Sequence, residues 1–409
     1  MGWRKSGMVC GILAWIMGIN MGACGRTQEA APAPEVALAP EEAVPAPEVA
    51  PAPEVAPAPE VAPAPEVAPA PEVAPAPEVA PAPEVAPAPE VAIQEPDIRS
   101  WDALSSRQQK ILDDIESDLP PEVLNAVRPE NEGQHFYRSD EKHPEMFYDT
   151  IANLGGTYIG VGTDQGYVYA GWQKPTLAFL IDYDPVIVVV HRIYMFLISQ
   201  CEDASCVLKN VGDREAMRAL FRSDAGRAAG LDDDQTWETY RDARHRMVLA
   251  LGMLKRMDKP TMMNDPETYR FIKTLIASGR MRTYQANLLG DTAFKSMADA
   301  LRALDARVTT LYLSNAEQYW GYTEKFKQNM TGLPYDEKGL IMRTSASYPS
   351  NNDYRYSVQP AEVFCAWLRH PEGRNVRSIT RRARIESPEH IPFSVDSRMP
   401  PAETDNSRK

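Results

Sequence analysis

The stretch TLAFLID, residues Thr176–Asp182, holds five consecutive apolar residues and ends in an acid. An uninterrupted apolar run of this length is typical of a parallel strand that is buried on both faces. An earlier run, Thr157–Gly162, predicts a second strand that ends in glycine. After the first run, Asp184-Pro185 predicts an N-cap followed by proline at the first helical position. The β-branched residues at 186–190 favour a strand at the same place, so both interpretations stay open.

Further along the chain, helical and strand-like patterns alternate. Residues 211–279 are mostly helical, with a clear start at Asn264-Asp265-Pro266 and a stop at Gly279. Strand patterns follow at 283–289, 309–313, 339–343 and 355–359, with helices at 292–305 and from about 316 between them. This alternation predicts an α/β domain over residues 98–370, with a Rossmann-like, mostly parallel sheet and a helical insertion at about 185–280.

The N-terminus has the features of an export signal. Arg4 and Lys5 precede an apolar stretch that is too short to remain as a membrane span. Met21-Gly22-Ala23-Cys24 resembles a bacterial lipobox, which predicts a signal peptide at 1–24 and a lipid anchor on Cys24. An ordinary cleaved signal peptide is the alternative. Because Gly25 follows the cysteine, resemblance to lipoprotein sorting rules favours the outer membrane.

Residues 25–97 are rich in proline, alanine and glutamate, and PAPEVA occurs eight times in tandem from Pro45 to Ala92. Alternate prolines favour polyproline II and the glutamates repel one another, so we expect a disordered, extended linker. At about 3.1 Å per residue, it reaches at most roughly 220 Å. This predicts a domain held in the cell envelope, in the periplasm or at the cell surface. Residues 371–409 are polar and arginine-rich and predict a partly disordered tail.

The formal net charge of −14 comes from the linker. Residues 28–97 hold 14 acids and no lysine or arginine, which leaves 43 acids and 43 bases in the rest of the chain. The remainder is therefore neutral, and its charge does not favour binding to nucleic acid. The expected partners are the membrane, through Cys24, and an unidentified small molecule or envelope component.

Three cysteines lie within the predicted domain. Cys201 and Cys206 are close in a polar segment and predict a small-loop disulfide in an exported protein. A metal pair is the alternative, but the six histidines show no paired-ligand spacing, so we expect no metal site. Cys365 lies among apolar residues and is expected to be buried and inert.

Candidate ligand-binding residues follow the predicted strands, because ligands of doubly wound sheets bind at the carboxyl ends of strands. Gly160, Gly162, Thr163, Asp164 and Gln165 form a glycine turn whose backbone N–H groups could face a ligand. Twenty residues after Gly162, Asp182 stands where an acid would bind a ribose diol. A tight strand–helix turn with Asp164 as N-cap explains the same pattern without a ligand.

Two further candidates lie later in the chain. Asp291 follows Gly290, and a turn with an N-cap for helix 292–305 explains it fully. In Ser314-Asn315-Ala316-Glu317-Gln318-Tyr319, polar Asn315, Glu317 and Tyr319 could face a ligand. Ser314 and Glu317 also fit a capping box, which does not need Asn315 or Tyr319. A lone histidine, His191, is interpreted as structural.

Four blocks carry a resemblance to a known family: GTYIGVGTDQGYVYAGW, LAFLIDYDPVIVVVHRIY, LLGDTAFKSMADAL and TLYLSNAEQYWGYTEKFKQNMTGLP. Over residues 140–365 they resemble an uncharacterised bacterial family known from leptospiral members, with a Rossmann-like domain related to class I methyltransferases that use S-adenosylmethionine (SAM). The resemblance implies that Gly160–Gln165 corresponds to the glycine-rich motif, that Asp182 is the ribose acid and that residues 314–317 follow the fourth strand. Tyr158 stands where those enzymes carry an acid, and their Asn-Pro-Pro-Tyr signature is absent.

Two functions from different classes follow. The first is a lipid-anchored envelope protein that presents a methyltransferase-like domain on a long tether for ligand or partner binding. The second is a SAM-dependent methyltransferase, in which case SAM is the cofactor. Export favours the first, because SAM is a cytoplasmic metabolite and because fold does not imply function.

Overall fold

The computed structural model describes residues 104–346, 353–381, 386–387 and 389–402. The predicted signal peptide, Cys24 and the proline-rich linker lie outside the described residues. No helix in the described ranges is both long and apolar enough to cross a membrane.

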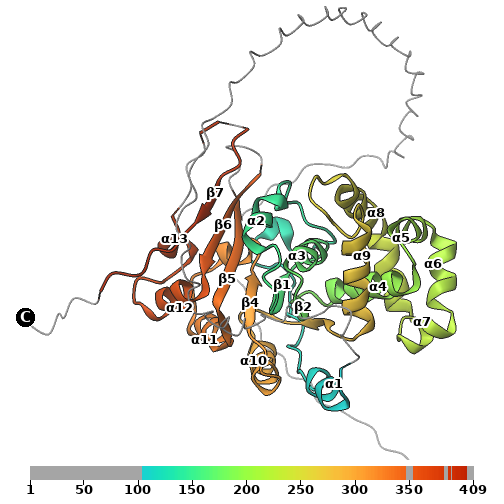
Figure 1. Ribbon diagram of the computed structural model, residues 1–409, viewed down its shortest axis with the longest axis horizontal. Coiled ribbons are helices and arrows are strands. Elements are labelled where there is room, and N and C mark those ends of the chain that lie inside the picture. The colour runs from blue at the N-terminus through green and yellow to red at the C-terminus, as the bar shows by residue number, and fades with distance from the viewer. Residues whose placement is uncertain (1–103, 347–352, 382–385, 388, 403–409) are drawn as a thin grey trace, which may run out of the picture. The chain divides into compact units, whose positions relative to one another are not determined.

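The core is a seven-stranded sheet with the order β3-β2-β1-β4-β5-β6-β7 (Figure 1). The first five strands in this order are parallel, β6 is antiparallel to β5, and β7 is parallel to β6. This confirms the predicted α/β, mostly parallel sheet. The strands are β1 (Thr157–Val161), β2 (Leu177–Asp182), β3 (Met281–Gln285), β4 (Val308–Tyr312), β5 (Tyr335–Ala346), β6 (Tyr354–Pro360) and β7 (Phe393–Val395).

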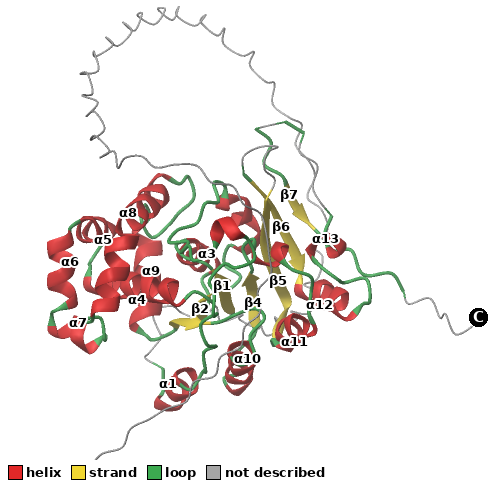
Figure 2. Cartoon of the chain, turned by 180° about the vertical axis from the view of Figure 1, so that it is seen from behind, coloured by secondary structure: helices red, strands yellow, loops and turns green. Residues whose placement is uncertain are grey.

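Helices cover both faces of the sheet (Figure 2). The helices longer than one turn are α1 (Ser106–Asp113), α3 (Gln165–Gln173), α4 (Pro185–Gln200), α5 (Ala204–Gly212), α6 (Arg214–Phe221), α7 (Asp224–Ala228), α8 (Asp234–Arg256), α9 (Pro266–Ala277), α10 (Ala293–Ala303), α11 (Glu324–Gly332) and α12 (Ala361–Arg369). Shorter ones are η2 (Pro129–Asn131), η3 (Pro144–Phe147), α2 (Tyr148–Ile151), η4 (Ala316–Tyr319) and α13 (Val376–Ile379).

Strand β2 shows how the sheet divides the core in two. Ala178 and Leu180 belong to the cluster that includes residues of α3, α4, α8 and α9, whereas Phe179 and Ile181 belong to the cluster of α10, α11 and α12. Every residue of β2 is buried because both faces are covered. The apolar run that predicted this strand is therefore explained by burial on two sides.

Six helices, α4 to α9, lie between β2 and β3 and gather at one end of the sheet (Figure 1). Asp184 caps α4 by accepting from the N–H of Val186, and Pro185 takes the first helical position, as predicted. The alternative strand over 186–190 is wrong. The cap and the burial of one side of the segment against the sheet outweigh the local β-preference of its valines.

The fold continues past residue 370, the predicted end of the domain. Strand β7 pairs with β6, with Tyr356 opposite Phe393, and α13 precedes it. This part of the chain shows little apolar pattern. Its only strand among the described residues, β7, has three residues and lies at the edge of the sheet. A strand this short leaves too weak a pattern to recognise in sequence.

Candidate functional site

The glycine turn after β1 is hydrogen-bonded to a buried histidine on α4. Gly162 has a φ of 107°, which side chains rarely allow, so glycine is needed here. Nε2 of His191, on α4, lies 2.7 Å from the carbonyl oxygen of Gly162, and Nδ1 lies 3.2 Å from the hydroxyl of Tyr167. Burial lowers the pKa of His191 to about 4, so the ring is neutral at pH 7. His191 thus has the structural role that the sequence analysis assigned to it.

The side chain of Gln165 packs against this turn, next to Gly162 and Thr163. Its Oε1 accepts from the backbone N–H of Thr163 at 3.2 Å, and a Cβ on Gly162 would come within 2.5 Å of its Nε2. The N–H of Gly162 donates to the carbonyl oxygen of Ile181. Two of the backbone donors of this turn, the N–H groups of Gly162 and Thr163, are therefore engaged by the protein itself.

Gly160 also serves packing. A Cβ at this position would lie 2.0 Å from the hydroxyl of Tyr158, two residues earlier on the same strand. The glycine makes room for that side chain.

Asp182 ends β2 beside the glycine turn and is 9% exposed. Its Oδ1 accepts from the N–H of Asp184 at 3.0 Å. Burial raises the pKa of Asp182 to about 7, although the hydrogen bond from that N–H acts to lower the pKa. The carboxyl group is therefore partly protonated at neutral pH. A group in this state can both donate and accept a hydrogen bond.

Asp164 does not cap α3 with its side chain, which corrects the alternative interpretation of this turn. Its Oδ1 instead accepts from the N–H of Ser139 at 2.8 Å and from the hydroxyl of Thr163 at 3.0 Å. Ser139 comes from a segment that precedes the first strand, and this segment was absent from the predicted site.

That segment, residues 118–143, is here called the strap. It runs along the carboxyl ends of the parallel strands in the order in which they lie in the sheet. The first half of the strap contacts residues at the ends of β3 and β2. The N–H of Asp118 donates to the carbonyl oxygen of Gln285 at 2.9 Å, Asn125 accepts from the hydroxyl of Tyr183, and His135 Nδ1 lies 2.7 Å from Asp184 Oδ2.

The second half of the strap contacts the turn after β1 and residues of β4, β5 and β6. Ser139 contacts the turn after β1, Glu141 lies above β4 and β5, and the N–H of His143 donates to the hydroxyl of Tyr356 on β6 at 2.9 Å. The strap begins after α1, which packs on α10, and ends before α2, which packs on α3. It therefore crosses from one face of the sheet to the other over the edge where ligands of such sheets bind.

Glu141 is the most deeply inserted acid of the strap, at 3% exposure. Its carboxyl group accepts from four hydroxyl groups, those of Tyr169 (3.2 Å), Thr344 (3.0 Å), Ser314 (3.4 Å) and Tyr312. Burial raises the pKa of Glu141 to about 7, and the hydroxyl donors act against this rise. A carboxyl group of this chain thus occupies the region next to the switch in strand order between β1 and β4.

A cavity of about 270 Å³ adjoins Glu141. The strap and the residues after it form one wall, and the start of α3 and the end of α8 form the other. Apolar Val168, Met253, Leu254 and Met257 line the helical side. Among the residues that the structure describes, no group of three histidine, cysteine, aspartate or glutamate side chains is arranged to hold a metal ion.

Asp291 lies away from these groups. It is exposed and forms an ion pair with Lys325 at 2.7 Å. The predicted N-cap role is wrong, because Asp118 of the strap accepts from the N–H groups of Thr292 and Ala293. A Cβ on Gly290 would come within 2.2 Å of Asp118 Oδ2, which explains the glycine at this turn.

The capping box predicted at residues 314–317 is also wrong. Ser314 points its hydroxyl at Glu141, and η4 begins without a side-chain cap. Glu317 is 1% exposed, forms a buried ion pair with Arg343 and accepts from the hydroxyl of Tyr322 at 2.6 Å. It belongs to the packing on the α11–α12 side of the sheet, since Tyr322 lies in that cluster.

Asn315 and Tyr319 both lie near the strap. The Nδ2 of Asn315 donates to the hydroxyl of Tyr354 at 3.3 Å, and that hydroxyl donates to Asp140 at 2.7 Å. The guanidinium of Arg128 lies 4.9 Å from the centre of the Tyr319 ring. The structure therefore gathers the glycine turn, Asp182, Asn315 and Tyr319 under the strap, and leaves out Asp291 and Glu317.

The strap and Glu141 were missed because residues 119–143 carry no helical or strand period. Their polar side chains meet partners that lie up to 214 residues away, such as Tyr354 for Asp140. No local pattern encodes contacts at such separations. The sequence signal that remains is the low apolar content of this segment.

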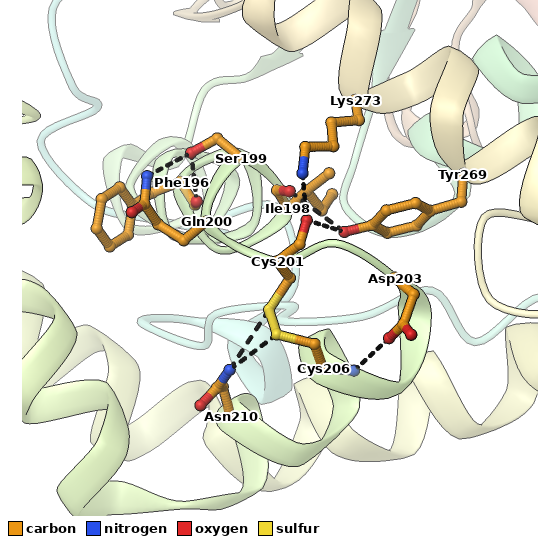
Figure 3. Close-up of a disulfide and its surroundings, with 10 residues drawn as sticks. All are labelled: Phe196, Ile198, Ser199, Gln200, Cys201, Asp203, Cys206, Asn210, Tyr269 and Lys273. Carbon is orange, nitrogen blue, oxygen red and sulfur yellow. Dashed lines mark hydrogen bonds between the residues drawn. A yellow bond between two sulfur atoms is a disulfide. The ribbon is translucent and has the colours of Figure 1, made fainter.

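Cys201 and Cys206 form a disulfide between the end of α4 and the start of α5, with their Cα atoms 5.5 Å apart (Figure 3). The Nδ2 of Asn210 lies 3.4 Å and 3.3 Å from the two sulfur atoms, and the hydroxyl of Tyr269 donates to the carbonyl oxygen of Cys201 at 2.9 Å. The bridge lies in the inserted helices. Cys365 is a free, buried thiol, and burial raises its pKa to about 11.

One family model matches the chain, over residues 136–395, and its description is "Domain of unknown function (DUF7790)". The match begins within the strap and ends with β7. It therefore includes Glu141 and all seven strands of the sheet. No significant match to a curated protein was found.

Proposed function

The chain belongs to the DUF7790 family, and we propose that its domain is a binding module of the cell envelope, tethered by a lipid on Cys24, which uses a Rossmann-like sheet without a nucleotide cradle. One observation carries the proposal. The N–H groups of Gly162 and Thr163 are bonded within the protein, and the side chain of Gln165 lies directly against Gly162. A nucleotide or nucleoside would have to displace Gln165 before it could reach the turn.

The strap supports the same conclusion. It lies over the switch point of the sheet, where a cofactor of a doubly wound fold would bind, and places Glu141 there with four hydroxyl partners. An acid in this position, partly ionised at pH 7, disfavours an anionic phosphate. It fits a site for an uncharged or weakly acidic group.

The N-terminal sequence supports the envelope location. The apolar stretch followed by Met21-Gly22-Ala23-Cys24 is similar to a lipoprotein signal, and the PAPEVA repeats fit a tether. The proposed partner is a small molecule or an envelope component within reach of this tether. The outer membrane is the proposed site of anchoring.

A SAM-dependent methyltransferase is the second candidate, and one observation favours it. Asp182 closes β2 next to the glycine turn, where the resemblance places a ribose-binding acid. If this candidate is right, SAM is the cofactor, and Gln165 and the strap move when it binds.

Calorimetric titration of the purified full chain with SAM and with S-adenosylhomocysteine separates the two candidates. We expect no heat and no shift in melting temperature with either compound. The Gln165→Ala variant is the matched test, because it opens the turn without touching Asp182. Micromolar binding that is lost in Asp182→Ala would establish the methyltransferase-like site and exclude the binding module proposed above.

The anchor is tested separately. We expect the Cys24→Ser variant, expressed in a bacterium with lipoprotein processing, to leave the membrane fraction. Cys365→Ser is the control, since Cys365 is a buried thiol of the folded domain. Equal membrane association of both variants would exclude the anchor on Cys24.

A further inference from the structure

The four hydroxyl groups around Glu141 form a site that belongs to the domain core. Tyr169 lies on α3, Tyr312 ends β4, Ser314 follows it, and Thr344 lies on β5. These residues come from separate elements, and their hydroxyl groups converge on one carboxyl group. Only the carboxyl group itself comes from the strap.

The strap is less firmly packed than the core that it covers. Leu119 is 88% and Phe136 is 52% exposed, and within the strap the helix assignment is limited to the three residues of η2. Its first residue, Asp118, is held by several hydrogen bonds, but further along the strap the upstream contacts include single polar ones, such as that between His135 and Asp184. Segments of this kind open at low free-energy cost compared with a buried strand.

The cavity beside Glu141 provides space for more than a carboxyl group. Its volume of about 270 Å³ lies near the lower end of small-molecule sites. Its apolar side chains from α3 and α8 could contact an aliphatic body, while the hydroxyl groups hold the acid. Lys142 and Arg256 line it together with the acidic residues Glu145, Asp164 and Asp258, so the recognition of an acid group rests on the hydroxyl groups and not on the net charge of the lining.

We propose that the four hydroxyl groups form a carboxyl-binding site for a small organic acid with a short aliphatic body, and that Glu141 is a built-in competitor that fills the site until the ligand displaces it. This inference rests on the proposed binding function and names its ligand class. It assigns Tyr169, Tyr312, Ser314 and Thr344 as the residues that bind the acid group.

The first test empties the site in the full chain. Glu141→Ala removes the last methylene and the carboxyl group, which together correspond to acetate. We expect acetate at about 100 mM to raise the melting temperature of E141A by about 3 °C, because a ligand that binds only the folded state stabilises it. Acetamide has the same shape but presents N–H groups to hydroxyl donors, so we expect no shift with it.

The matched control is the double variant Glu141→Ala/Tyr312→Phe, which lacks one of the hydroxyl donors. We expect it to lose most of the acetate effect and to keep its fold. An equal rise with acetate and acetamide, or an equal rise in the double variant, would overturn the assignment of the hydroxyl groups. The SAM titration is independent of this result, so failure of the proposed function is recognised separately.

The second test uses the unmodified chain and does not depend on folding of E141A. Propionate corresponds to the whole glutamate side chain and competes with Glu141. An intramolecular group acts at millimolar effective concentration, so the competitor must exceed that range. We expect at least threefold faster hydrogen exchange at the amides of Ser139, Glu141 and His143 in about 200 mM propionate, and no change in propionamide. Unchanged exchange in both solutions would overturn displacement of the strap.

Discussion

The imidazole of His191 holds the carbonyl oxygen of Gly162 at 2.7 Å, which ties the inserted helices to the turn after β1. We predict that His191→Leu lowers the free energy of unfolding by about 2 kcal/mol, because the carbonyl and the hydroxyl of Tyr167 lose a buried partner. Urea denaturation measures this. The control His245→Leu alters an exposed histidine on α8 and should change the stability by less than about 0.5 kcal/mol. Similar losses in both variants would contradict the role of His191.

The acid of the strap makes stability depend on pH. The pKa of Glu141 is raised to about 7, so the folded protein binds its proton more tightly than the unfolded chain does. The stabilisation of the fold by this tighter proton binding is fully present below about pH 4.5 and is lost as the pH rises towards 7. We therefore expect Glu141→Gln to gain stability relative to the unmodified chain by about 3 kcal/mol between pH 4.5 and pH 8.

Denaturant curves of both proteins across this pH range give the difference directly. Asp182 and His191 titrate in the same range, but they are present in both proteins and cancel. The comparison therefore isolates the carboxyl group of Glu141. Two pH profiles that run parallel would show that Glu141 keeps an ordinary pKa in the fold.

Alanine substitutions at Gly162 and Gly133 distinguish backbone strain from steric clash with a neighbouring side chain. Both have positive φ, but a Cβ on Gly133 meets nothing within 4 Å, whereas one on Gly162 meets Gln165 at 2.5 Å. We predict a loss of about 1 kcal/mol for Gly133→Ala and at least about twice that for Gly162→Ala. Adding Gln165→Ala to Gly162→Ala should recover the difference. Chemical denaturation tests this, and equal losses without recovery would mean that Gln165 does not fill the turn.

The two acids that the structure separates from the site differ in their environment. Glu317 is buried with Arg343, whereas Asp291 is exposed with Lys325. Glu317→Gln leaves the buried guanidinium without its counter-charge, so we predict a loss of about 3–5 kcal/mol. Asp291→Asn should cost less than about 0.5 kcal/mol, as is usual for surface pairs. Calorimetric melting compares them, and a small effect at Glu317 would refute the buried pair.

Local signals accounted for most of the fold. The apolar run at 177–181 and the Asp265-Pro266 start both act within a few residues, so the sequence alone was enough to place β2 and α9, whereas the Asp184-Pro185 start of α4 left a strand over 186–190 as an alternative. The candidate site depended on partners that no local pattern reveals. The glycines of 160–162 resemble a cradle, but the N–H of Gly162 is bonded to Ile181, and whether the N–H of Thr163 is free depends on the rotamer of Gln165.

The same limit applies to helix caps. Asp291 stands where a cap is expected, yet Asp118 provides it from 174 residues earlier in the chain. Local reasoning assigned the right chemistry to the wrong carboxylate. Residues that meet only through the completed sheet, such as Glu141 and Thr344, can be found only from the structure.

The path of the strap also sets an order of assembly. Its contacts with β4, β5 and β6 join residues 171, 203 and 213 positions apart, and they exist only once those strands have paired. The strap is synthesised before every strand that it touches, yet it must dock after them. Because closing loops of this length early is entropically costly, we expect the sheet to form first and the strap to dock late. In the export that we propose, the N-terminus would cross the membrane first, and this segment would stay undocked until the C-terminal strands have crossed.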